Sequence, residues 1–140
     1  MEIAKTPDCN FGEKPKDFKL KGVDNKIYTL NDFKDRFGTL VMFICNHCPY
    51  VNAFIKEIVE DVEYFRTEGI KSVAIMSNDT KNYPEDSFEN MILFQRNTNL
   101  IFHIYLMKPK KLPNLTVPSV HQIFLVMEIG NMTDYNTEVE

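Results

Sequence analysis

The sequence predicts a single α/β domain, and three neighbouring segments carry that prediction. Apolar runs at residues 39–44 and 70–76 flank a long segment of helical spacing, residues 51–65. Short apolar runs bounded by turn residues are typical of buried strands. A strand, a helix and a second strand in this order form a right-handed crossover with parallel strands. Cys45 and Cys48 lie between the first strand and the helix, at the carboxyl edge of the sheet, where α/β proteins carry their sites.

Composition restricts the class of protein. The chain has 140 residues, 44% of them apolar and 26% charged, which suffices for one domain with a hydrophobic core. The net charge of −4 provides no basic surface for nucleic acid. The first residues lack the basic and apolar regions of a signal peptide, and no apolar run approaches the roughly 18 residues of a membrane span. We therefore expect a cytoplasmic protein with neither nucleic acid nor a membrane as a partner.

The N-terminal part predicts a hairpin and a short helix. Residues 17–23 alternate between polar and apolar side chains, residues 24–25 supply a turn, and residues 26–30 resume the alternation. Asn31 is a suitable N-cap for a short helix that ends at Gly38. Both elements precede the first buried strand.

The segment after the cysteines is the clearest helix in the chain. Its apolar positions keep a helical spacing and its charged positions occupy the other face, a pattern typical of a helix packed on a sheet. The apolar positions are Val51, Phe54, Ile55, Ile58, Val59, Val62 and Phe65. Gly69 ends this helix, and a loop over residues 77–84 follows the second strand. We expect Asp86 to cap a further helix, with Glu89 completing a capping box.

Cys45 and Cys48 are spaced as a redox-active dithiol. Three cysteines in all, two of them at this spacing, indicate a catalytic or metal site in a reducing compartment more than a secreted disulfide framework. The N-terminal end of a helix favours the thiolate over the thiol, and the thiolate is the nucleophile. A cysteine about one helical turn further on can attack a mixed disulfide formed at the first. We therefore expect Cys45 to attack and Cys48 to resolve.

Several motifs along the chain resemble those of one known family. They are DF at 17–18, GVD at 22–24, DFK at 32–34, VMFICNHCPYV at 41–51, SND at 77–79, YPEDS at 83–87 and ENM at 89–91. Together they resemble the peroxiredoxin-like branch of the alkyl hydroperoxide reductase/thiol-specific antioxidant (redoxin) family, in the thioredoxin superfamily. The resemblance implies a thioredoxin-like fold, a central sheet with flanking helices. In it Cys45 matches the attacking cysteine and Cys48 the resolving one.

The same resemblance implies a thiol-disulfide oxidoreductase or a peroxiredoxin-like antioxidant protein that needs no cofactor and no metal. Its partners would be a disulfide or peroxide substrate and an external dithiol reductant of the thioredoxin or glutathione type. Typical peroxiredoxins place a Thr or Ser three residues before the attacking cysteine, where this chain has Met42. Because a thioether cannot donate a hydrogen bond to a peroxide, the chain departs from the usual peroxidase pattern and favours disulfide exchange.

Four residues are predicted to support the dithiol: Asn46, His47, Pro49 and Pro118. His47 resembles the central dipeptide of oxidising disulfide-bond enzymes, in which an imidazole near the sulfur stabilises the thiolate. The alternative is that His47 is simply an exposed loop residue. Pro118 is included as a thioredoxin-type cis-proline that would lead a strand at residues 116–126 and face the dithiol.

The C-terminal part differs sharply in composition from the rest. Residues 98–127 contain no Asp, Glu, Gly or Ala, and three prolines interrupt the remaining strands and helix that the family would have. We therefore divide the chain into an N-terminal arm at 1–16, a redoxin domain at 17–97 and a divergent tail at 98–140. On this division the fold is incomplete at its C-terminus.

A shift of reading frame would explain the tail. Codons for residues 102–124, read from the third base of the first codon and with suitable synonymous choices, translate as PYLFDETQKVA followed by KSYGAVCTPDFF. These peptides hold the missing family motifs in order, so we favour a one-base insertion or deletion near residues 93–97. The competing hypothesis is a genuine strand at 116–126 led by a cis Pro118, although only about 5% of X-Pro bonds in folded proteins are cis.

Two other functions stay open. If the tail is out of frame and the scaffold does not hold the dithiol, the chain is a redox-inactive remnant. A metal site would use Cys45, Cys48 and His47, but a structural zinc site needs four converging ligands, and the sequence has no second CxxC. Neither Cys9 nor the other two histidines have ligand spacing.

Overall fold

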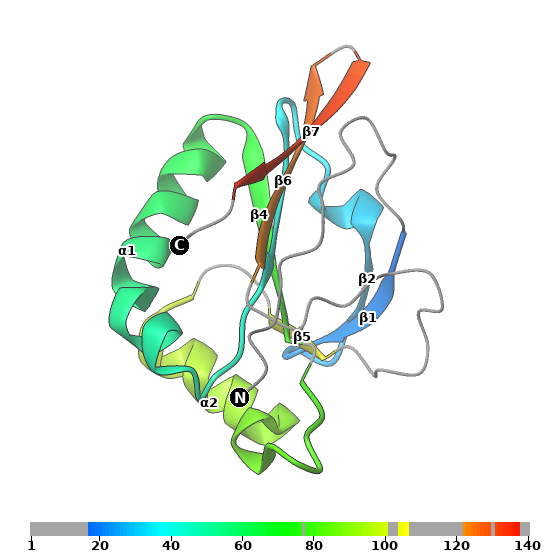
Figure 1. Cartoon of the computed structure of the whole chain (residues 1–140). Helices are drawn as coiled ribbons and strands as arrows, with labels where there is room; N and C mark the ends of the chain where they lie inside the picture. Colours follow the sequence, from blue (N-terminus) through cyan, green and yellow to red (C-terminus); the bar gives the residue numbers. More distant parts are fainter. Residues whose placement is uncertain (1–16, 77, 101–103, 107–121, 130, 138–140) are drawn as a thin grey trace, which may run out of the picture.

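The computed structural model describes residues 17–76 and 78–100, together with strands at 104–106, 122–129 and 131–137. Within this part, seven strands form one sheet in the order β2-β1-β5-β4-β3-β6-β7 (Figure 1). The strands are β1 (Lys19–Gly22), β2 (Ile27–Thr29), β3 (Gly38–Phe43), β4 (Ile70–Met76), β5 (Ile104–Leu106), β6 (Gln122–Ile129) and β7 (Asn131–Thr137). The helices are α1 (Pro49–Thr67) and α2 (Phe88–Thr98), with short 3-10 helices η1 (Leu30–Phe33) and η2 (Pro84–Asp86).

β3 and β4 form the parallel centre of the sheet, and α1 crosses from one to the other. Their register runs from Gly38 opposite Ile70 to Phe43 opposite Ile75. Parallel strands need such a crossover because the chain must return to the edge where the first strand began. After α1, Gly69 adopts a positive φ of 83°, and a Cβ there would lie only 3.1 Å from the ring of Phe37. The predicted strand, helix and strand are confirmed.

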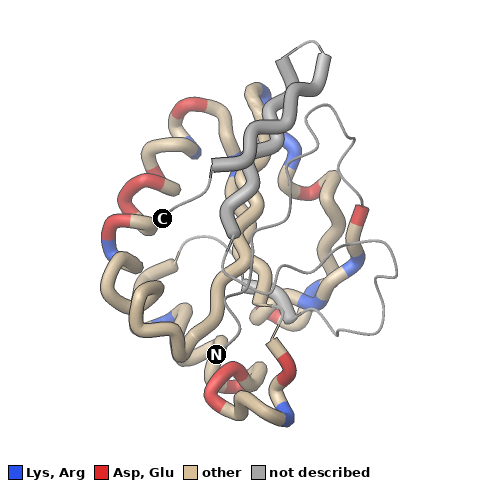
Figure 2. Tube along the Cα trace, viewed as in Figure 1, with Lys and Arg blue, Asp and Glu red and all other residues tan. Residues whose placement is uncertain are grey.

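The two faces of the sheet bury different side chains. Along β3, Leu40 and Met42 belong to the core that α1 and α2 cover, whereas Val41 and Phe43 belong to the core on the opposite face. This alternation is the period of two that a strand imposes on its side chains. Both helices lie on the same side of the sheet (Figure 1). The charged positions of α1 lie mainly along its outer side, away from the sheet (Figure 2).

Two predicted helix caps are wrong. At η1, the Asp32 carboxylate accepts a hydrogen bond from the Thr29 backbone N–H at 2.7 Å, so the N-cap is Thr29 rather than Asn31. At α2, the N-cap is Ser87, whose side chain accepts a backbone N–H from the first turn. Asp86 instead ends η2 and is buried in the protein. The α2 cap is displaced because another set of hydrogen bonds holds the Asp86 carboxylate.

Strands from the predicted tail join the sheet on both sides of its centre. β5 pairs in parallel with β4 and antiparallel with β1. β6 pairs antiparallel with β3, and β7 with β6. β6 begins inside the strand considered at 116–126, while Pro118 and Cys9 lie outside the described residues. The α/β class is confirmed, and the frame shift, which concerns the gene, stays a hypothesis.

Candidate active site

The dithiol lies where β3 ends and α1 begins. Cys45 follows β3 by two residues, and Cys48 is the N-cap of α1, with Pro49 as the first helical residue. Proline suits this position because it lacks the N–H that the first turn of a helix leaves unpaired. Both cysteines are buried, at 3% and 7% exposure, and they are not joined in a disulfide. The structure thus brings the two thiols to the carboxyl end of the central strand, in a segment we call the cysteine loop, residues 44–48.

A buried carboxylate lies at the centre of the site. Asp86 comes from residues 78–87, between β4 and α2, which we call the facing loop, and its exposure is 0%. Its Oδ1 accepts the backbone N–H groups of Asn46, at 2.8 Å, and of His47, at 3.3 Å. Its Oδ2 accepts the Asn78 amide at 2.9 Å and lies 2.7 Å from His47 Nδ1. Four hydrogen bonds offset the cost of burying this charge, and they hold the two loops together.

His47 is held in one orientation by contacts on its edge and on its face. Oδ2 of Asp86 is an acceptor in the ionised form, so the Nδ1–H of the ring donates to it. Tyr83 from the facing loop stacks on the ring, with centroids 5.2 Å apart and planes 8° from parallel. About one third of the His47 side chain, 33%, stays exposed. The interpretation of His47 as simply an exposed loop residue does not fit this set of contacts.

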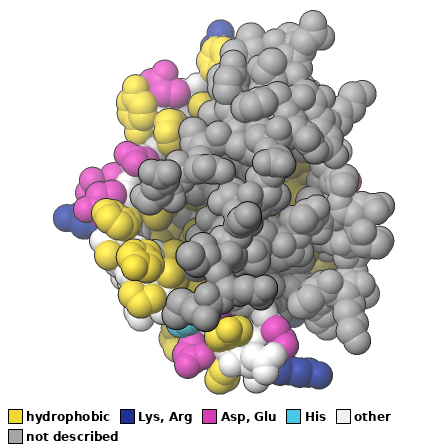
Figure 3. Space-filling view, in the orientation of Figure 1, with side chains coloured by type: hydrophobic (Ala, Val, Ile, Leu, Met, Phe, Trp, Pro, Cys, Tyr) yellow, Lys and Arg dark blue, Asp and Glu magenta, His cyan; other side chains and the backbone are white. Residues whose placement is uncertain are grey.

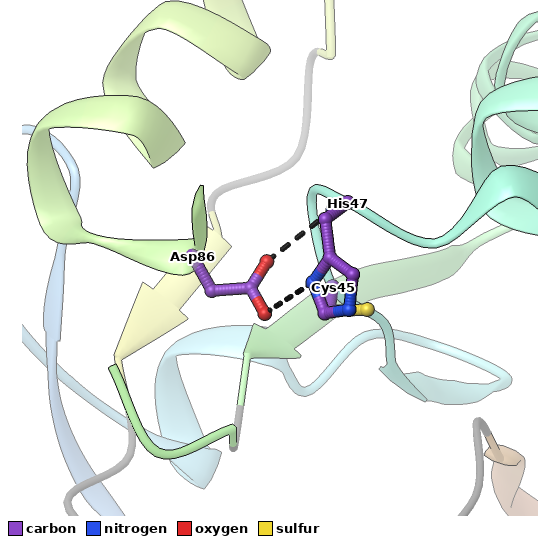
Figure 4. A group of neighbouring side chains, drawn as sticks. All are labelled: Cys45, His47 and Asp86. Atoms are coloured by element: carbon purple, nitrogen blue, oxygen red, sulfur yellow. Dashed lines mark hydrogen bonds and ion pairs between the residues drawn. The ribbon is translucent and has the colours of Figure 1, made fainter. Parts of the chain in front are cut away.

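The imidazole of His47 lies beside both the Asp86 carboxylate and Cys45 (Figure 4). One nitrogen, oxygen or sulfur atom from each of the three residues lies within 4.8 Å of the other two. With Nδ1 engaged by Asp86, Nε2 is the ring nitrogen that remains to face another group. The arrangement therefore gathers a nucleophile, an imidazole and an orienting carboxylate in one cluster.

Asn46 ties the cysteine loop to its surroundings on both sides. Its side-chain amide donates to the Glu85 backbone carbonyl at 3.3 Å, across to the facing loop. Its own carbonyl accepts the Asn52 side-chain amide, from α1, at 3.0 Å. These contacts position the backbone that carries Cys45, although Asn46 has no group aimed at the sulfur among the described contacts.

The Cys45 thiol is not activated in the way the sequence predicts. Burial, together with the negative charge of Asp86, raises its pKa from the ordinary 9.0 to about 11. Backbone hydrogen bonds from Cys48 and His47 act in the opposite direction but do not outweigh these effects. The expectation that the start of the helix holds Cys45 as a thiolate is therefore wrong. The thiol keeps its proton at neutral pH, and its reaction needs a base.

A metal site is an alternative interpretation of this cluster. The donor atoms of Cys45, His47 and Asp86 lie within 4.8 Å of one another. Each oxygen of Asp86 already takes part in two hydrogen bonds, which occupy the lone-pair positions of a carboxylate. A cation bound by Asp86 would have to displace the bonds that orient His47 and the cysteine loop. The donor set therefore fits a hydrogen-bonded network better than a metal site.

Sequence reasoning missed three residues of the facing loop: Asn78, Tyr83 and Asp86. This loop follows the carboxyl end of β4, the strand that is parallel to β3. Because the carboxyl ends of neighbouring parallel strands meet at one edge of the sheet, the loops that follow them lie side by side. The SND and YPEDS motifs, read with that topology, carried the missing signal.

Exposed aromatic side chains lie on α1, close to the dithiol in sequence. Tyr50 is 79% exposed and Phe54 is 59% exposed. Figure 3 shows hydrophobic side chains gathered along the side of the molecule that α1 forms. In the part of the chain that the structure describes, neither helix is both long enough and apolar enough to span a membrane.

Solved structures with the same architecture include two bacterial proteins of high similarity. One is an uncharacterized conserved protein from Geobacillus kaustophilus, with a TM-score of 0.84 and 28% identity over 94% of this chain and 70% of that one. The other is a hypothetical protein from Sinorhizobium meliloti 1021, with a TM-score of 0.87 and 23% identity over 97% and 74%. A thiol:disulfide interchange protein of the thioredoxin family from Chlorobium tepidum TLS has a TM-score of 0.70 and 15% identity over 94% and 88%. These similarities confirm the thioredoxin-like fold.

The family comparison agrees with the motifs. No protein in a search of curated proteins matches the chain. The model of the AhpC/TSA family matches residues 11–112, which is most of the chain. With its CxxC pair at Cys45 and Cys48, this chain is a thiol-based redox protein that belongs to the AhpC/TSA (redoxin) family.

Proposed function

We propose that the protein is a thiol-disulfide oxidoreductase in which Cys45 attacks a disulfide and Cys48 resolves the mixed disulfide. The observation that carries this proposal is the placement of the two thiols. Cys48 begins α1 and belongs to the same buried cluster as Cys45, at the carboxyl edge of the sheet. A resolving thiol so close in the chain can reach the mixed disulfide with little backbone movement.

The proposed cycle transfers two electrons from the protein to its substrate. Cys45 Sγ loses its proton and bonds to one sulfur of the substrate disulfide, whose S–S bond breaks and releases the first thiol. Cys48 then attacks the Cys45 sulfur, which releases the second thiol and leaves a Cys45–Cys48 disulfide. One external dithiol of the thioredoxin type, or two thiols of the glutathione type, reduce that disulfide and are oxidised to a disulfide themselves.

Two observations favour a disulfide over a peroxide as the substrate. Met42 occupies the position three residues before Cys45 and is 1% exposed, so no hydroxyl is offered to a peroxide at that place. Tyr50 and Phe54 offer exposed aromatic surface on the first turns of α1, the helix that Cys48 caps, which suits a polypeptide better than a small oxidant. We therefore place protein disulfides first among the substrates and hydroperoxides second.

The test compares both substrates with one set of variants. We expect the full-length protein to reduce insulin disulfides with dithiothreitol faster than it reduces hydrogen peroxide or an organic hydroperoxide. Cys45→Ser should abolish turnover with either substrate. Cys48→Ser should stop turnover while a mixed disulfide at Cys45 accumulates, visible as added mass. Cys9→Ser, the matched control, should keep full activity.

Three outcomes would change the assignment. Peroxide turnover that exceeds disulfide turnover would make the protein a peroxidase. Equal loss in Cys9→Ser and Cys45→Ser would contradict the assigned roles. A folded protein that turns over neither substrate would be the redox-inactive remnant. Because the cycle requires a reducing dithiol, we propose the cytoplasm as its compartment, which fractionation of cells that produce the chain would test.

A further inference from the structure

We propose that Asp86 and His47 form a proton relay for Cys45, in which Asp86 is the positioning residue and His47 Nε2 accepts the proton of the attacking thiol. The inference rests on the proposed function, because it supplies the base that the first step of that cycle needs. It goes further in assigning a role to a buried carboxylate from a different loop.

The geometry fixes which nitrogen of His47 can act. Asp86 Oδ2 holds Nδ1 at 2.7 Å, and Asp86 Oδ1 accepts the His47 backbone N–H at 3.3 Å. Tyr83 packs flat against the ring and holds its plane. In a neutral imidazole one nitrogen carries the proton and the other accepts, and Asp86 assigns the proton to Nδ1. Nε2 is therefore the basic nitrogen.

Cys45 lies in surroundings that make such a base useful. The ionisable groups that face it are Asp86, His47 and Cys48, and the burial of the thiol together with the charge of Asp86 raises its pKa to about 11. A thiolate formed in advance would place a negative charge beside the negative Asp86. If the proton leaves as the new S–S bond forms, that charge does not accumulate. The relay thus explains how a thiol that is a poor acid can still attack at neutral pH.

The step balances in protons and electrons. The Cys45 proton moves to His47 Nε2 while the sulfur electron pair forms a bond to one sulfur of the substrate, and the substrate S–S bond breaks. The imidazolium is stabilised by its hydrogen bond to the Asp86 carboxylate. His47 then returns the proton to the leaving sulfur, so the relay is restored. The Cys45 sulfur, one ring nitrogen of His47 and one oxygen of Asp86 lie within 4.8 Å of one another, so that a rotation of the Cys45 side chain or one bridging water can connect the thiol to the imidazole.

The experiment distinguishes two possible roles of Asp86, because they predict opposite changes in the alkylation rate of Cys45. If Asp86 acted only as a nearby charge, Asp86→Asn would lower the Cys45 pKa and speed its alkylation. If Asp86 orients the base, Asp86→Asn should slow alkylation at pH 7 by about tenfold or more, as expected for loss of general-base catalysis. We would measure iodoacetamide modification of the full-length protein from pH 6 to 11 in a Cys48→Ser background, read from the peptide that carries Cys45.

A second variant separates the relay from damage to the fold. His47→Gln keeps Asp86 and should slow alkylation at pH 7 as much as Asp86→Asn does. In the His47→Gln background, Asp86→Asn should cause no further slowing, because only its charge effect remains and that effect speeds the reaction. Glu89→Gln removes an exposed negative charge from the first turn of α2 and serves as the matched control, with an unchanged rate expected.

Two results would overturn the relay: faster alkylation in Asp86→Asn with His47 present, or an unchanged rate in His47→Gln. If Asp86→Asn does not fold, the His47→Gln result alone decides. Alkylation needs no disulfide substrate, so the relay and the proposed function fail separately. A protein that shows the relay profile but does not reduce insulin would contradict the proposed function alone.

Discussion

The cysteine loop and the facing loop make different contributions to the same site: one carries the thiols and the other carries the buried carboxylate. The cysteine loop carries both thiols within one continuous motif, and its place follows from the strand and helix on either side. The facing loop carries no thiol, yet its Asp86 accepts hydrogen bonds from two backbone groups of the cysteine loop. The comparison teaches that the nucleophile is a local feature, whereas its acidity and its base depend on a loop from the neighbouring strand.

The largest expected effect is the loss of the contact between the loops. Asp86→Ala should lower the free energy of unfolding by about 3 kcal/mol, because it leaves part-buried donors of Asn46 and Asn78 without their acceptor. Denaturant unfolding monitored by circular dichroism measures this. Glu85→Ala, at the exposed neighbouring position, should change stability by less than about 0.5 kcal/mol. Equal effects of the two variants would show that Asp86 does not join the loops.

Alkaline pH tests how much the protonated Cys45 thiol contributes to the stability of the folded protein. The folded protein holds the Cys45 proton more tightly than the unfolded chain, so this stabilisation is present below pH 9.0 and is lost as pH rises toward 11. We expect a loss on the order of 2 kcal/mol across that window. The pH series should be run in a Tyr28→Phe background, because a hydrogen bond to Asp24 raises the pKa of Tyr28 to about 12. The same slope in Cys45→Ala would contradict the prediction.

The same substitution, asparagine to alanine, can be made at two positions to compare how strongly each contact stabilises the site. Asn78 in the facing loop donates to the buried Asp86 carboxylate, while Asn52 on α1 donates to the Asn46 carbonyl at an exposed position. Asn78→Ala should cost about 1.5 kcal/mol, since its partner is charged and buried, and Asn52→Ala about 0.5 kcal/mol. Thermal unfolding of both variants would measure the difference. A larger effect of Asn52→Ala would mean that the cysteine loop is held from α1 rather than from the facing loop.

The helix cap at the end of the facing loop should contribute less than the contacts of Asp86. Ser87 caps α2 through a hydrogen bond from the Asn90 backbone N–H, so Ser87→Ala should cost about 1 kcal/mol and Ser87→Asp much less. Denaturant midpoints of the two variants provide the measurement. No difference between Ser87→Ala and Ser87→Asp would show that the side-chain cap does not stabilise α2.

The caps show where reasoning from residue type fails. Asp86 and Asn31 are both good N-cap residues, and the sequence alone could not rank them against Ser87 and Thr29. For Asp86, a tertiary contact decided the matter, because four donors gathered from elsewhere hold its carboxylate. Local propensity is a weak guide where a residue has a partner distant in sequence.

The sequence by itself determined the parallel centre of the sheet, the crossover helix and the position of the two thiols. These follow from apolar runs and helical spacing within one stretch of chain, so short-range patterns suffice to predict them. Only the tertiary structure decided that Cys45 is a weak acid and that His47 is oriented by Asp86. Asn46 and Asp86 are separated by 40 residues and meet because β3 and β4 end at the same edge of the sheet. Acidity depends on burial and on charges at close range, and these quantities exist only after the chain has folded.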